Sequence, residues 1–164
     1  MSDPLAVYLH DHLAGAQHAI ELVQAMKDKY RGHPLGGFAD ALLTEIQSDM
    51  EVLRGIAERI GSGSNQLKEM AMWLAEKVSR LKLGRGPEDR LGTFEALEFL
   101  ELGIHGKWAL WRALSSIAGS DSRLQGIDFE HLAARAESQR SAVDQRRMEM
   151  ALVALSNRTG QAAQ

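Results

Sequence analysis

Apolar residues recur every three or four positions along most of the chain, a spacing that predicts amphipathic helices. Four predicted helices are long and of similar length. A fifth, shorter one is apolar on a single narrow face, which is typical of a helix on the outside of a domain. The predicted helices span Pro4 to about Tyr30, about Leu35 to Ile60, about Gln66 to Leu83, Thr93 to Ala118 and about Asp128 to Ser156.

Turn-forming residues separate these helices. Asp3 and Pro4 suit the cap and first position of the first helix, and Thr93 is the expected cap of the fourth. Glycine-containing breaks follow at residues 32–34, 61–65, 84–87 and 119–121. The chain therefore divides into discrete helices joined by short turns.

The helix lengths predict an all-α fold. A helix of about 25 residues is about 38 Å long, so the four long helices match as a bundle. Short turns join them into two antiparallel hairpins, and the helix at 66–83 is long enough to return the chain along the bundle. We expect a ferritin-like, up-down-down-up four-helix bundle with an additional crossover helix. We expect a single domain over residues 1–164, with a frayed end at residues 157–164.

The amino-acid composition limits the class of protein and its cellular location. The 164 residues are 45% hydrophobic and 25% charged, which are globular values, and the net charge of −3 argues against nucleic-acid binding. The chain has no cysteine, which excludes disulfides and thiol chemistry and suits a cytoplasmic protein. Residues 1–12 show no signal-peptide pattern, and we expect neither a signal peptide nor a membrane span.

Polar side chains interrupt the most apolar helix, 93–118, which is apolar on almost every face and is expected to be central and buried. Glu98, Glu101 and His105 fall within about 60° of one another around this helix. Buried carboxylates need a hydrogen bond, a cation or a metal. These three residues are therefore the first candidate site.

Other helices carry polar residues on apolar faces too. His12 lies on the apolar face of the first helix and Asp49 within the apolar stripe of the second. In the first hairpin, the predicted heights of His12 and Asp49 along the helix axis differ by about 6 Å. Glu45 is expected to lie one turn further from the height of His12. In the second hairpin, Arg140 is expected level with His105 and close to Glu101.

These residues partly resemble the metal motif of the ferritin-like superfamily. Its di-iron and di-manganese members use two lone glutamates and two Glu-x-x-His motifs. Here His12 stands for one lone Glu, and Glu98 or Glu101 for the other. The motifs read Glu45-Ile-Gln-Ser48 and Glu137-Ser-Gln-Arg140, so both lack the histidine. The chain is most similar to small uncharacterised bacterial branches of the superfamily. The implied metal ligands come from His12, Asp49, Glu98, Glu101, His105 and Glu137.

Three functional hypotheses follow. The first is a metal-binding ferritin-like protein that holds iron, manganese or zinc. The second is a metal-free interaction or structural module, a homo-oligomer and most simply a dimer, with a buried layer of Glu101, His105 and Arg140. Arg140 supports it, because a guanidinium repels a metal cation. On this hypothesis Arg140→Ala strands buried carboxylates and destabilises strongly. The third is a metal-dependent hydrolase of the four-helix type that uses three histidines, although only His12 and His105 are expected to face inward. Use of the same polar groups for an organic ligand or for acid–base chemistry is a further alternative.

We assign no function to the remaining histidines and tryptophans. His18, His33 and His131 are expected on the surface, and Trp108 and Trp111 in the core. No phosphate loop, dinucleotide fingerprint, nucleophile elbow or His-Glu-x-x-His motif is present. The sequence therefore leaves open whether the protein is an enzyme.

Overall fold

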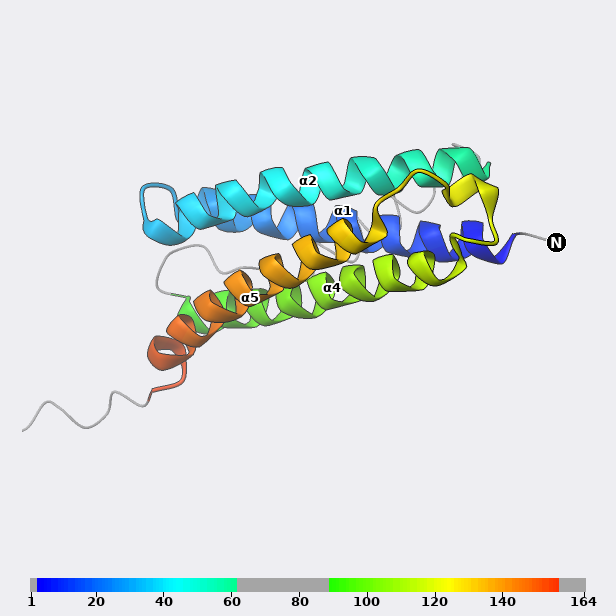
Figure 1. The fold of residues 1–164 in the computed structure, drawn as a ribbon. Helices are drawn as coiled ribbons and strands as arrows, with labels where there is room; N and C mark the ends of the chain where they lie inside the picture. Colours follow the sequence, from blue (N-terminus) through cyan, green and yellow to red (C-terminus); the bar gives the residue numbers. More distant parts are fainter. Residues whose placement is uncertain (1–2, 62–88, 157–164) are drawn as a thin grey trace, which may run out of the picture.

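The computed structural model describes residues 3–61 and 89–156, which are helical nearly throughout and contain no strand (Figure 1). Within them, the all-α prediction is confirmed. The predicted helix at 66–83 and the predicted frayed end at 157–164 lie outside the described residues. The elements are α1 (Pro4–Lys29), α2 (Pro34–Ile60), α4 (Arg90–Ile117), the 3₁₀ turn η1 (Ser122–Leu124) and α5 (Phe129–Ala154).

Aspartate side chains cap the N-termini of three helices, α1, α4 and α5. Asp3 accepts a hydrogen bond from the Leu5 N–H at 3.0 Å, and Asp128 accepts one from the His131 N–H at 2.9 Å. Both satisfy backbone donors that a helix start leaves free. Gly61 ends α2 in the left-handed conformation, at φ +84°, which glycine adopts without strain.

The cap predicted for α4 was wrong. Asp89 caps this helix, accepting from the Gly92 N–H at 2.9 Å, so α4 starts three residues before Thr93. Thr93 is instead buried, and its hydroxyl lies 2.6 Å from the Tyr30 hydroxyl and accepts a hydrogen bond from Lys29. Thr93 therefore ties the start of α4 to the end of α1.

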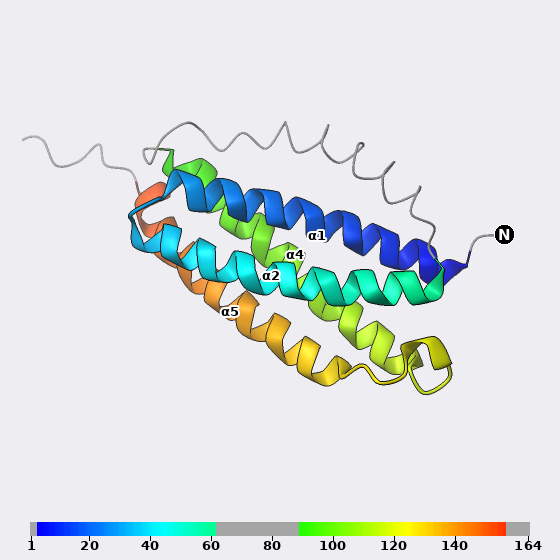
Figure 2. The ribbon, with the colours of Figure 1, turned by 90° about the horizontal axis from the view of Figure 1, so that it is seen from above.

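The helices form two antiparallel hairpins, α1–α2 and α4–α5, packed against each other (Figures 1 and 2). Lys29 at the end of α1 meets Thr93 near the start of α4, and Arg123 after α4 pairs with Asp3 before α1 at 2.6 Å. Hence α1 and α4 run in opposite directions. The order along the described chain is up, down, down, up, and the structure confirms a helical bundle.

The helix predicted at 93–118 was expected to be buried on every face, but α4 is buried on only part of its circumference. On α4, Leu97, Leu100 and Trp111 are buried, but Phe99 is 44% exposed and Leu102 is 63% exposed. The reason is geometric, because α4 packs on α5 along one side and on α1 along another, which leaves a third side open. No helix of the described residues is both long and apolar enough to cross a membrane.

Candidate functional site

Asp49 is the most deeply buried carboxylate among the described residues, and only 2% of it is exposed. It lies in the inward stripe of α2, as the sequence predicts. Lys107 of α4 pairs with its Oδ2 at 2.5 Å, and Arg135 of α5 pairs with its Oδ1 at 2.6 Å. One carboxylate thus joins three helices through two cations.

Gln139 completes this group. Its amide nitrogen donates to Asp49 Oδ2 at 3.1 Å and to Glu45 Oε2 at 3.0 Å, while its oxygen accepts a hydrogen bond from Lys107. We call Glu45, Asp49, Lys107, Arg135 and Gln139 the Asp49 cluster. It contains two cations and two anions, so its formal charges balance.

Lys107 is the more buried of the two cations in the cluster. Its side chain is 15% exposed. Burial lowers the pKa of its ammonium group, because an apolar setting disfavours the charged form, and the Asp49 carboxylate opposes that shift.

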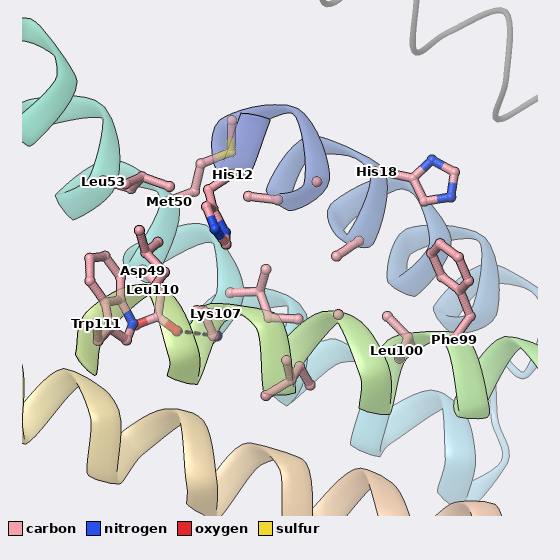
Figure 3. A pocket seen from close by; sticks show the side chains of 16 residues that line it. His12, His18, Asp49, Met50, Leu53, Phe99, Leu100, Lys107, Leu110 and Trp111 are labelled. Carbon is pink, nitrogen blue, oxygen red and sulfur yellow. Dashed lines mark hydrogen bonds and ion pairs between the residues drawn. The ribbon is translucent and has the colours of Figure 1, made fainter. Parts of the chain in front are cut away.

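A cavity of about 340 Å³ adjoins the cluster, between α1, α2 and α4 (Figure 3). Most of its wall is apolar. In Figure 3, Trp111 and Leu53 lie at one end, His18 and Phe99 at the other, and His12 and Lys107 between them. Its volume is within the range of pockets that bind small organic molecules.

The cavity exists because small residues face it. Ala16 and Ala19 of α1, together with Gly15 and Gly103 on α1 and α4, line it where larger side chains would fill the space. A Cβ added at either glycine would meet no atom within 4 Å. Both glycines are exposed, so they form part of the cavity rim.

Two buried polar side chains of the cavity wall have no hydrogen-bond partner among the described residues. Trp111 is 1% exposed, and its indole Nε1 bonds to nothing there. His18 is 8% exposed, and neither of its ring nitrogens is paired. Such atoms are rare in folded proteins, since leaving one unsatisfied costs about 1–3 kcal/mol.

The burial of His18 corrects the expectation that it lies on the surface. Its ring packs edge-on against the ring of Phe99 on α4, with centroids 5.1 Å apart. The first helix is therefore covered on more than the face that its apolar stripe predicts. Periodicity identifies the most apolar face of a helix, and it does not reveal a second face buried by contact with α4.

His12 and Asp49 both line the cavity. The hairpin register predicts that these two residues lie at similar heights along the bundle. The ring of His12 is half-buried and packs edge-on against Tyr8, at 4.7 Å between centroids. Burial lowers the pKa of His12, against an opposing effect of Asp11. The imidazole is therefore uncharged near neutral pH.

A second group of charges lies at the surface between α4 and α5. Arg140 pairs with Glu101 at 2.9 Å and with Glu137 at 2.8 Å, and all three side chains are partly exposed. Hydrogen bonding from Arg140 lowers the pKa of Glu137. We call these three residues the Arg140 cluster. Glu101 and Arg140 are close together, as the hairpin register predicts, but they lie at the surface and do not form a buried layer.

Two further predicted site residues point away from the interior. Glu98 and His105 are both exposed, and His105 stacks on Trp108 with centroids 5.3 Å apart. The predicted helix phase of α4 was wrong by roughly a third of a turn. The true inward stripe passes through Leu100, Ile104 and Lys107.

The structure does not bring the proposed metal ligands together. Asp49 lies in the Asp49 cluster, Glu101 and Glu137 lie in the Arg140 cluster, and His12 lies on the cavity wall. Residues 3–61 and 89–156 contain no group of three or more His, Asp or Glu side chains placed to hold a metal ion.

No protein-family model, curated protein or solved structure matches this chain. The function is therefore inferred from the cavity and the residues around it.

Proposed function

We propose that this protein binds a small, largely apolar organic molecule in the cavity between α1, α2 and α4. One observation carries the proposal: an apolar cavity of about 340 Å³ whose wall holds the unpaired, buried nitrogens of Trp111 and His18. A bound molecule would fill the space and accept hydrogen bonds there. The apolar wall and the few polar groups set along it are typical of ligand sites.

The energetics favour an occupied cavity. Apolar surface removed from water contributes about 25 cal/mol per Å², so a ligand that covers this wall gains free energy from burial alone. Pairing a buried donor removes a penalty of about 1–3 kcal/mol. The two terms act at the same place, which makes the cavity the best-supported site in the described residues.

The helix order supports a ferritin-like topology, and the crossover helix that this topology requires lies outside the described residues. Topology alone does not supply a function, since one fold hosts many. A metal at the predicted positions would have to displace Lys107 and Arg135 from Asp49, or Arg140 from Glu101. These ion pairs favour an organic ligand over a metal ion.

The test is titration with the uncharged fluorescent probe N-phenyl-1-naphthylamine. We expect wild-type protein to bind the probe in a saturable way, with enhanced, blue-shifted emission, because the probe enters an apolar site. Gly103→Phe places an aromatic ring at the rim and should weaken binding at least about tenfold.

Gly106→Phe is the matched control. Gly106 lies one turn further along α4, has open space around it and does not line the cavity. It should leave probe affinity unchanged. Absence of saturable binding by the wild type, or equal loss in both variants, would refute the proposed site.

A further inference from the structure

We infer that the ligand of this cavity is an uncharged apolar carbonyl compound, such as an aryl ketone or a quinone. The inference rests on the proposed function and adds the chemical class of the ligand. Three properties of the wall carry it: balanced charge, unpaired hydrogen-bond donors and an otherwise apolar lining.

The first property is charge. Lys107 and Asp49 are the charged side chains that the described residues contribute to the cavity wall, and they pair with each other at 2.5 Å. Arg135 and Glu45 balance the rest of the cluster from outside the cavity. An anionic or cationic ligand would therefore find no unpaired counter-charge and would lose its hydration on entry, which disfavours both.

The second property is an excess of donors near Lys107 and Trp111; His18, at the other end of the cavity, has a ring nitrogen that can accept as well as one that can donate. Two N–H groups of Lys107 are directed at Asp49 and Gln139, which leaves the third without an acceptor in the described part of the chain. The indole N–H of Trp111 also lacks one. Ammonium and indole groups donate and do not accept, so they call for an acceptor on the ligand.

The third property is the remainder of the wall. Leu53, Leu100, Ile104 and Leu110 surround these donors with hydrocarbon. A sugar or polyol would bring several hydroxyl donors to a wall that is mostly hydrocarbon, whereas a ketone or quinone brings only acceptor oxygens. A flat aryl carbonyl therefore satisfies both the donors and the apolar surface.

The experiment compares three ligands of one skeleton as competitors of N-phenyl-1-naphthylamine: fluorene, fluorenone and fluorene-9-carboxylate. Fluorene is the most hydrophobic, so burial alone predicts that it binds at least as tightly as fluorenone. We expect the reverse, with fluorenone several-fold tighter and fluorene-9-carboxylate at least about tenfold weaker than fluorenone.

Two measurements identify the donors. Trp111→Phe should reduce the preference for fluorenone over fluorene, while Trp108→Phe, a half-buried tryptophan off the cavity wall, should preserve it. Should Trp111→Phe fail to fold, the infrared carbonyl stretch of fluorenone bound to wild-type protein remains decisive. Hydrogen bonding lowers its frequency relative to fluorenone in hexane.

The outcomes separate the two proposals. If the probe and fluorene bind but fluorenone shows no preference and no frequency shift, the carbonyl inference is overturned and the cavity remains a binding site. If fluorene-9-carboxylate binds most tightly, the charge argument is overturned. If none of the four molecules binds, the proposed function fails as well.

Discussion

The Asp49 cluster and the Arg140 cluster use similar chemistry in different surroundings. The Asp49 cluster joins α2 to α4 and α5, and the Arg140 cluster joins α4 to α5, each through carboxylates and an arginine at distances of 2.5 to 2.9 Å. The Asp49 side chain, however, is only 3% exposed, while the Glu101 and Glu137 side chains are 19% and 47% exposed. Water therefore screens the Arg140 cluster more than the pair of Asp49 and Lys107, whose side chains are 3% and 15% exposed.

This difference decides what each cluster does for the fold. Exposed ion pairs contribute little, because water already solvates both partners. Removing one partner from a buried pair leaves an uncompensated charge in a poorly solvated place, which is strongly destabilising. The Asp49 cluster should therefore hold α2 against α4 and α5, while the Arg140 cluster should be nearly dispensable.

The largest effect is expected from Asp49→Asn, which keeps the shape of the side chain and removes its charge. We expect the free energy of unfolding to fall by about 3 kcal/mol, since Lys107 and Arg135 lose their shared counter-ion. The value lies at the lower end of the range because Arg135 is 31% exposed. Urea unfolding, followed by circular dichroism, measures it.

Asp40→Asn is the matched control, because Asp40 also lies on α2 and pairs with a lysine, Lys27, but its side chain is 60% exposed. It should change the free energy of unfolding by less than about 1 kcal/mol. Equal effects of the two variants would contradict the assignment of Asp49 as the main charged link between the hairpins.

A smaller effect is expected from pH. Burial lowers the pKa of His12 below its unfolded value of about 6.5, so the folded state binds the proton less readily than the unfolded state. Stability is then complete above about pH 6.5 and falls as the pH drops through the folded pKa of His12.

Urea unfolding between about pH 7.5 and about pH 5.5 tests this, in a range where carboxylates titrate little. His12→Gln should flatten the decline, whereas the same substitution at the exposed His33 should leave it as in the wild type. A wild-type stability that rises toward pH 5.5 would show that the sign is wrong.

The two hairpins also show how far the sequence predicts the site. On α2 a clear apolar stripe fixes the helix phase, so Asp49 was identified as an inward carboxylate. On α4 nearly every face is apolar, and no polar face fixes the phase. Glu98 and His105 were therefore assigned inward although they are exposed, and Lys107 was missed.

One signal could have found Lys107. It lies three residues after Ile104 and four before Trp111, both buried, which is the spacing of a shared helix face. The cavity itself had no such signal, because it results from small residues on two helices that meet only in the folded chain. The unpaired Trp111 nitrogen likewise depends on tertiary contacts, which periodicity does not encode.

The smallest effect is expected from Arg140→Ala, for which burial of the Glu101, His105 and Arg140 layer would have predicted a large loss. Glu101 and Glu137 can both be rehydrated when the arginine is removed, since both are partly exposed. Thermal unfolding should therefore match that of the wild type within error, at low and at high salt, under conditions that resolve Asp49→Asn. A loss as large as that of Asp49→Asn would mean that water does not reach the Arg140 cluster, and the contrast between the two clusters would then disappear.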